Sequence, residues 1–191
     1  MKLFFDTETT GMANFKESPD SRCQPRLVQL GALLVDANNN ELITVNMIVK
    51  PDGFEIPKEA SNIHGISTEK ANEIGVSLES VMKIFIQLRS MSDTIIGHNL
   101  NYDVFVMRGE WMRLGLSYDD SEKDQFCTMQ ASTNICKIPG KYGKFKWPKL
   151  VEVYNFAFGK EFVGAHDAMA DIRATKDVYN WLQDLKKSEE E

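Results

Sequence analysis

Residues 3–11 read Leu3-Phe4-Phe5-Asp6-Thr7-Glu8-Thr9-Thr10-Gly11, an apolar run that turns acidic at Asp6. Apolar residues bounded by a Thr/Gly turn signal predict a short buried strand. Side chains alternate faces along a strand, so Asp6 and Glu8 point the same way and Thr7 points away. Two carboxylates on one face of a buried strand repel each other, so they share a proton or hold a cation. Such oxygen ligands suit Mg²⁺ or Mn²⁺, although two solvated acids at a strand end are the commoner origin of a single Asp-x-Glu.

The composition is that of one globular domain. The chain has 191 residues, of which 42% are hydrophobic and 26% charged, enough to form one sizeable core. A net charge of −6 argues against an evenly basic nucleic-acid-binding surface, although a polyanionic substrate responds to local charge. Three widely spaced cysteines, Cys23, Cys127 and Cys136, argue against zinc and disulfides, so we expect a reducing, cytoplasmic location. We expect no signal peptide and no membrane association, because no apolar run approaches about 20 residues.

The remaining pattern predicts a mixed sheet covered by helices. Further strands are expected at 27–36, 41–49, 93–97 and 126–129, the first two of them as an antiparallel hairpin. Helices are expected at 57–61, 77–91, 99–114, 148–158 and 168–187. This order predicts an α/β fold with a five-stranded mixed sheet and helices on both faces. We expect a single domain over residues 1–187 and a frayed acidic tail at 188–191.

Residues 137–149 combine positive charge with aromatic rings. Five lysines and no acid occur there, with Tyr142, Phe145 and Trp147 interleaved among them. A surface that binds a single strand needs cations for phosphate and rings for base stacking. The alternative is a solvated loop whose aromatic side chains pack into the core. Lys141, Lys144 and Lys146 are the candidate substrate contacts of this segment.

Two further acids stand at the starts of predicted helices. Asp103 lies in the first turn or so of a helix that follows a strand, where the helix dipole favours an anion. Asp171 lies one helical turn after Asp167, so one of these two acids can face inward. His166 directly precedes them. Each residue alone has an ordinary reading, as a first-turn acid or a solvated histidine.

Taken together, these residues indicate a catalytic site. The four acids Asp6, Glu8, Asp103 and Asp171 stand at strand ends and helix starts, where α/β folds gather function. Four converging carboxylates can hold two divalent ions about 3.5–4 Å apart, the arrangement used in phosphoryl transfer. His166 beside such a site can take a proton from water.

The chain resembles the DnaQ-like 3′–5′ exonucleases of the DEDD superfamily, histidine subtype. Residues 5–11 are similar to the first motif of that family, 97–103 to the second and 166–175 to the third, and 63–66 match a further segment. The resemblance covers nearly the whole chain and implies a ribonuclease H-like fold. A tyrosine-subtype member carries tyrosine four residues before the last aspartate, where this chain has Asp167. His166, five residues before, matches the histidine subtype.

The resemblance implies hydrolysis with two divalent ions, Mg²⁺ or Mn²⁺. In that scheme Asp6 bridges both ions, and Glu8 and Asp171 complete the first site. Asp103 supports the second ion, and His166 is the general base for water that attacks the 3′-terminal phosphodiester and releases a nucleoside 5′-monophosphate. The contacts to the terminal nucleotide would come from Thr9, Gly11, Met12, His64 and Asn99. Met12 replaces the more usual leucine and can fill the same wedge role.

Three functions remain open at this point. The first is a 3′–5′ exonuclease on single-stranded DNA, the second a 3′–5′ exoribonuclease similar to ribonuclease T or oligoribonuclease, and the third a nucleic-acid-binding module without activity. The intact set of acids and histidine argues against the third. Choosing DNA over RNA depends on contacts to the 2′-hydroxyl, and a likeness to the proofreading epsilon subunit of DNA polymerase III favours DNA. That likeness also makes a DNA polymerase a candidate partner, bound through the folded surface, and the oligomeric state stays open.

Overall fold

A computed structural model describes residues 1–116, 124–164 and 167–190, except for the side chains of 189 and 190. Its centre is one five-stranded sheet with the order β3-β2-β1-β4-β5. The strands are β1 (Lys2–Thr9), β2 (Leu27–Val35), β3 (Glu41–Ile48), β4 (Thr94–Gly97) and β5 (Asp124–Cys127). The central strand β1 is antiparallel to β2 and parallel to β4. The predicted mixed sheet and its leading hairpin are confirmed.

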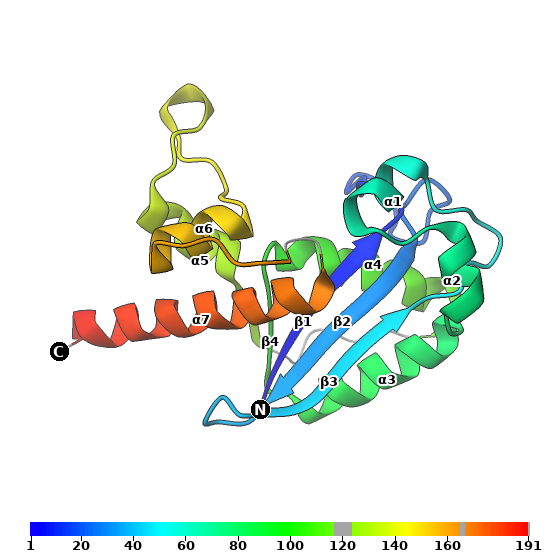
Figure 1. Ribbon diagram of the computed structural model, residues 1–191, viewed down its shortest axis with the longest axis horizontal. Coiled ribbons are helices and arrows are strands. Elements are labelled where there is room, and N and C mark those ends of the chain that lie inside the picture. The colour runs from blue at the N-terminus through cyan, green and yellow to red at the C-terminus, as the bar shows by residue number, and fades with distance from the viewer. Residues whose placement is uncertain (117–123, 165–166, 191) are drawn as a thin grey trace.

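Helices cover both faces of the sheet, as predicted. They are α1 (Lys58–His64), α2 (Thr68–Ile74), α3 (Leu78–Met91), α4 (Leu100–Arg113), α5 (Thr128–Cys136), α6 (Leu150–Phe158) and α7 (Ala168–Glu190), with a short 3-10 turn η1 (Lys141–Gly143). Helix α7 crosses one face, with α5 and α6 beside it, while α3 and α4 lie on the other face (Figure 1). In the described part of the chain, no helix has the length and apolar character needed to cross a membrane.

The alternation of side chains in β1 separates two cores. Leu3 and Phe5 pack in the cluster that includes residues of α3 and α4. Phe4 packs in the cluster on the opposite face, together with Met169 and Ile172 of α7. Because successive strand residues face opposite sides, the acids that continue the even series after Phe4 are directed to the α7 side.

Glycine in β2 allows α7 to approach the sheet closely. Gly31 pairs with Asp6 across the β1–β2 ladder. A β-carbon at Gly31 would lie 2.6 Å from Ile172 Cδ1, which is too close, and 3.0 Å from Ala168 Cβ, which is tighter than an ordinary contact. The missing side chain therefore brings the first turn of α7 over the middle of β1, next to Asp6.

Strand β4 is short, and its end determines where α4 begins. It pairs with β1 only from Lys2 to Phe4, and the chain then turns at Asn99 into α4. Asn99 has a left-handed backbone, with φ 68° and ψ 38°, and holds the predicted N-cap position. Its side chain makes no capping hydrogen bond, so the predicted cap is right in position and wrong in chemistry. The start of α4 thus lies beside the part of β1 that follows Phe4 and does not pair with β4.

Two helices were not predicted, and the fifth strand ends earlier than predicted. Helix α2 was not predicted, because within it only Ala71 is buried and no apolar stripe marks it. The fifth strand ends at Cys127, and residues 128–136 form α5. This helix was missed because it contains Ser, Thr and Asn, which are weak helix formers. Helix α1 starts within residues 57–61, as predicted, and extends to His64. Helix α7 continues to Glu190, and the fraying expected for residues 188–191 stays a prediction.

Candidate active site

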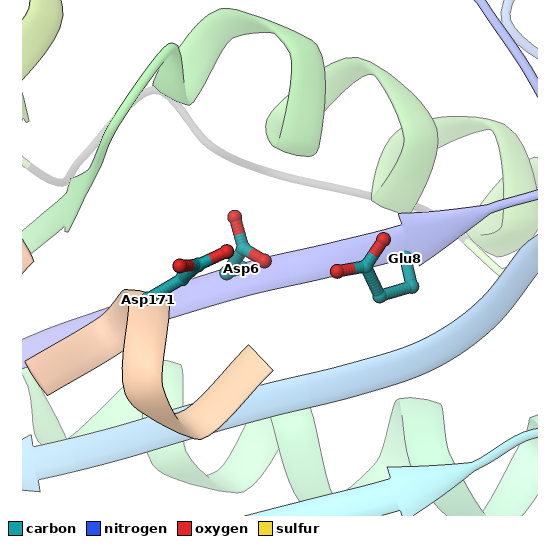
Figure 2. Close-up of side chains that lie close together, drawn as sticks. All are labelled: Asp6, Glu8 and Asp171. Carbon is teal, nitrogen blue, oxygen red and sulfur yellow. The ribbon is translucent and has the colours of Figure 1, made fainter. Parts of the chain in front are cut away.

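Three carboxylates meet where β1 passes under the start of α7. Asp6 and Glu8 come from β1, and Asp171 comes from the first turn of α7 (Figure 2). One oxygen from each of the three lies within 4.8 Å of the others. In Figure 2, Asp171 and Asp6 lie side by side, and Glu8 stands farther along the strand with its carboxylate turned to the same side. This arrangement follows from the alternation in β1 and the close approach at Gly31.

The pKa values of these acids show the cost of gathering them. Burial, and then the charge of Asp171, raises the pKa of Asp6 to about 7. Burial, followed by the charges of Asp6, Asp171 and Asp167, raises the pKa of Glu8 to about 8. Among the described residues no ion pair neutralises Asp6 or Glu8. A purely carboxylate donor set under mutual repulsion fits a hard divalent cation.

Asp103 approaches β1 from the side of α4. It is 3% exposed, and its Oδ1 accepts hydrogen bonds from Thr7 N at 2.9 Å and Thr7 Oγ1 at 2.7 Å. Burial, and then the charge of Asp6, raises the pKa of Asp103 well above its usual range, and the two Thr7 bonds oppose that shift. The negative charges of Asp103 and Asp6 therefore repel each other, but Asp103 lies outside the group of three carboxylates. Its role as a metal ligand stays a prediction.

Asp167 and Asp171, the two acids at the start of α7, have different roles. Asp167 Oδ1 accepts the backbone N–H groups of Met169 at 3.1 Å and Ala170 at 3.0 Å, which caps the helix. Asp171, one turn later, is the acid that joins the carboxylate group. His166, the predicted general base, lies outside the described residues.

The turn after β1 brings together several predicted substrate contacts. Thr9 Oγ1 donates to Gly11 O at 2.9 Å, and Tyr102 Oη donates to the same carbonyl at 2.6 Å. His64 of α1 lies beside this turn: its Nδ1 accepts Ile66 N–H at 3.2 Å, burial lowers its pKa, and the nearby backbone of Thr9 opposes that shift. Met12, by contrast, is 87% exposed to solvent.

Tyr102 was not predicted as a site residue. Burial raises its pKa to about 12, so the phenol keeps its proton and remains a donor to the turn. The sequence signal that could have found it is its position directly before Asp103. Because Asp103 has to lie beside β1, Tyr102, which precedes it at the start of α4, also lies near the end of β1.

Asn99 lines a cavity of about 410 Å³ that also reaches Asp171. The neighbouring His98 is structural: its Nδ1 lies 3.0 Å from Thr128 Oγ1 and its Nε2 lies 3.0 Å from Pro148 O. Burial lowers the pKa of His98 to about 4, so the ring is neutral at physiological pH.

The three lysines that were predicted to contact substrate do not belong to the carboxylate group. Lys141 and Lys144 are exposed in the segment that joins α5 to α6. Lys146 forms an ion pair with Glu152 at 2.5 Å, so its charge is already matched within the protein. Their part in substrate binding stays a prediction.

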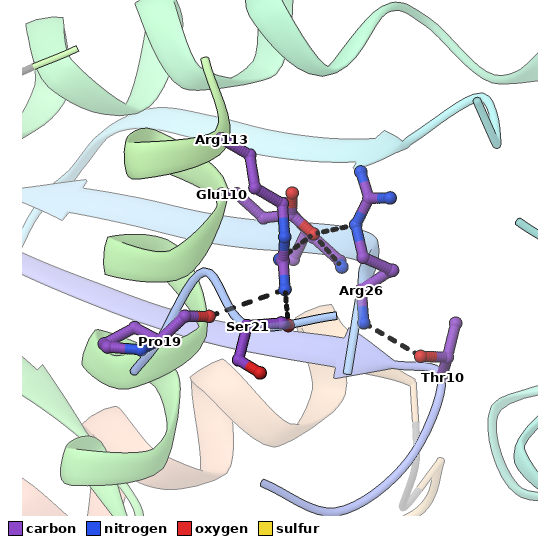
Figure 3. A network of polar contacts seen from close by, with 7 residues as sticks. Thr10, Pro19, Ser21, Arg26, Glu110 and Arg113 are labelled. Atoms are coloured by element: carbon purple, nitrogen blue, oxygen red, sulfur yellow. Dashed lines mark hydrogen bonds and ion pairs between the residues drawn. The ribbon is translucent and has the colours of Figure 1, made fainter. Parts of the chain in front are cut away.

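A buried ion group anchors the chain that follows the turn (Figure 3). Glu110 Oε1 accepts Arg26 Nε at 2.8 Å and Leu27 N at 2.9 Å, and Arg113 Nη1 lies 3.2 Å away. Arg26 N in turn donates to Thr10 Oγ1 at 2.8 Å. Sequence reasoning missed this group, because a lone glutamate within a helix is usually solvated.

The same group fixes the loop between β1 and β2 onto α4. Arg113 Nη2 donates to Ser21 O at 3.1 Å and to Pro19 O at 3.4 Å (Figure 3). A β-carbon at Gly109 would lie 2.3 Å from Pro19 O, so the loop and α4 touch backbone to backbone. Helix α4, which also carries Asp103, therefore holds the loop between β1 and β2 in place.

A family model described as exonuclease, RNase_T, matches residues 3–179. The chain is 27% identical over 190 residues to the uncharacterized exonuclease CP81 of Escherichia phage 186, covering 95% of this chain and 87% of that protein.

Solved structures share the fold. The chain is similar to E. coli exonuclease I in complex with a dA16 oligonucleotide, with TM-score 0.72, 21% identity and 95% of this chain covered. It is also similar to exonuclease I from Methylocaldum szegediense, with TM-score 0.75, 23% identity and 96% covered, and to the zinc-bound E. coli exonuclease I–single-stranded DNA complex, with TM-score 0.75, 22% identity and 95% covered. The match spans only 40% of the length of each of these three chains.

Proposed function

The chain belongs to the RNase_T exonuclease family, DnaQ-like 3′–5′ exonucleases, and from this premise we propose that it digests single-stranded DNA from the 3′ end with the help of divalent metal ions. One observation carries the proposal: Asp6, Glu8 and Asp171 bring carboxylate oxygens within 4.8 Å of one another. These acids come from separate elements, β1 and α7, and no internal cation matches Asp6 or Glu8 among the described residues.

Asp6, Glu8 and Asp171 would hold Mg²⁺ or Mn²⁺, and we propose two ions, with Asp103 supporting the second. When bound, such ions acidify water and offset the negative charge of the phosphoryl group. Asp103 has one oxygen tied to Thr7, so it is oriented by β1 before any ligand arrives. His166, by resemblance to the family, accepts the proton from water.

The terminal nucleoside is proposed to lie against the turn after β1. Thr9 and Tyr102 both hydrogen-bond to Gly11 O, which makes this turn a rigid surface. His64 borders the turn, and Met12, 87% exposed, offers an apolar side chain to a base. Asn99 is exposed in the cavity next to Asp171, where a phosphate or sugar would pass.

DNA is favoured over RNA in this proposal. The similar E. coli exonuclease I structures hold single-stranded DNA oligonucleotides, which supports a DNA strand as the ligand of this fold. An exoribonuclease is the alternative, because the choice depends on contacts to the 2′-hydroxyl.

The test is a time course on two 5′-labelled single strands of one sequence, DNA and RNA, with millimolar Mg²⁺ or Mn²⁺. We expect the DNA to shorten from its 3′ end to nucleoside 5′-monophosphates. Asp171→Asn should abolish the ladder, and Asp184→Asn, an exposed acid on the far part of α7, is the matched control. A ladder on RNA alone would replace the DNA assignment, and an unaffected Asp171→Asn protein would remove the carboxylate group from the mechanism.

A further inference from the structure

Between α5 and α6 the chain forms a projecting arm, residues 137–149, which we call the basic arm (Figure 1). It is a built hairpin, because Lys146 N donates to Ile138 O at 3.0 Å and Gly140 N donates to Lys144 O at 2.9 Å. Figure 1 shows it extending from the α5–α6 pair, away from the sheet.

The aromatic side chains of the arm face solvent. Tyr142 at the tip is 97% exposed, Trp147 at the base is 67% exposed and Phe145 is 44% exposed. Tyr142 also adopts a left-handed backbone with φ 58°, a conformation that residues with a β-carbon seldom take. The alternative in which these rings pack into the core therefore does not describe this arm. Exposed rings on a rigid support are stacking platforms for bases.

The arm is also a local excess of positive charge on an acidic protein. It carries five of the 22 Lys and Arg residues and no acid, while the whole chain has a net charge of −6. Among the described residues only one of these five lysines, Lys146, makes an ion pair, with Glu152. Lys141 and Lys144 are exposed on the outer part of the arm. Their charge complements the phosphates of a nucleic acid strand.

The base of the arm opens onto the carboxylate group. Trp147 and Lys149 line the same cavity of about 410 Å³ as Asn99 and Asp171. The arm is fixed there, because His98, the residue before Asn99, lies 3.0 Å from Pro148 O through its Nε2 atom. A strand that leaves the acids through this cavity therefore meets Trp147 first and the outer arm next.

We propose that the basic arm binds the single strand on the 5′ side of the nucleotide that is removed. Bases stack on Trp147 and Tyr142, and Lys141 and Lys144 contact phosphates. The inference rests on the proposed exonuclease function and extends it, because it makes turnover depend on strand length and salt.

Two substrates separate the arm from the chemistry. One is a 5′-labelled DNA strand of about twelve nucleotides, long enough to cover the arm. The other is the p-nitrophenyl ester of thymidine 5′-monophosphate, which has no nucleotide on the 5′ side. The variants are Trp147→Ala and the pair Lys141→Gln with Lys144→Gln. The matched control is Lys186→Gln with Lys187→Gln, which removes the same charge from the exposed end of α7.

In Trp147→Ala we expect the ratio of kcat/KM for the strand to that for the ester to fall about 5- to 150-fold, the size of one lost base stack. In the double lysine variant, strand binding should depend less on salt. The slope of log K, where K is the binding constant for the strand, against log salt concentration should decrease in magnitude by about 1.4. Fluorescence anisotropy in the presence of Ca²⁺ measures this binding. The control should keep both wild-type values.

The outcomes distinguish the two proposals. If wild type hydrolyses both substrates and the arm variants keep the wild-type ratio and salt slope, the arm inference is overturned and the exonuclease stands. If strand and ester lose activity equally, the arm is only structural and the inference is again overturned. If wild type hydrolyses neither substrate but the arm variants lose strand affinity, the arm inference holds and the exonuclease fails.

Discussion

Replacing Asp6 by asparagine should stabilise the metal-free protein. The folded state raises the pKa of Asp6 from 3.8 to about 7, so folding disfavours its ionised form. A raised carboxyl pKa costs stability in full above about pH 7, and the cost disappears as the pH falls from about 7 towards 4. Asparagine carries no charge at any pH, so it escapes this cost and keeps nearly the same shape.

The size of the effect follows from the shift. About three pKa units correspond to about 4 kcal/mol. Solvent reaches the partly buried carboxylate, which reduces the figure to about 2 kcal/mol. For a domain of this size each kcal/mol moves Tm by about 2–4 °C, so Asp6→Asn should unfold about 4–8 °C higher than wild type at about pH 8 in EDTA. Near pH 4.5 the difference should shrink to about a quarter.

Circular dichroism melts with and without millimolar Mg²⁺ provide the assay. Mg²⁺ should raise the Tm of wild type and leave Asp6→Asn nearly unchanged, because the variant lacks a ligand. Asp52→Asn, an exposed acid outside the carboxylate group, is the control and should follow wild type. An Asp6→Asn protein that melts at or below the wild-type temperature in EDTA at about pH 8 would refute the repulsion argument.

Further substitutions probe other parts of the site. His166→Ala should lower kcat about 10²–10⁴-fold in rapid-quench assays, the usual loss for a general base, with Mn²⁺ affinity near that of wild type; loss of Mn²⁺ binding instead would make His166 a ligand. Glu110→Gln should lower the free energy of unfolding in urea by about 3 kcal/mol, because it leaves Arg26 and Arg113 without their shared carboxylate. An equally stable Glu110→Gln protein would contradict the anchoring role of this group.

The central strand and the facing of its acids were predictable from the sequence. Strand side chains alternate strictly, so the pattern from Leu3 to Glu8 determined which acids share a face, and the packing of Phe4 against α7 agrees with it. The five-stranded mixed sheet followed from the order of elements, because a tight turn forces the β2–β3 hairpin.

What the sequence could not predict depends on contacts between distant elements. The spacing of Asp167 and Asp171 alone left both as candidates, and only the family resemblance favoured Asp171. The hydrogen bonds to Met169 and Ala170 identify Asp167 as the cap. Helix α5 lacks a local helix signal and forms through packing against α6 and α7. The exposure of Trp147 is likewise a tertiary property, because an apolar ring in a basic loop is as compatible with the core as with solvent.

Isothermal titration of Mn²⁺ into the wild-type protein tests the metal-centre claim most directly. With pKa values of about 7 and about 8, Asp6 and Glu8 hold protons near neutral pH, so Mn²⁺ binding should release protons, seen as heats that differ between buffers. Binding should tighten as the pH rises through this range, and Asp171→Asn should lose it. Mn²⁺ binding that releases no protons and survives in Asp171→Asn would contradict the assignment of these three carboxylates as the metal centre.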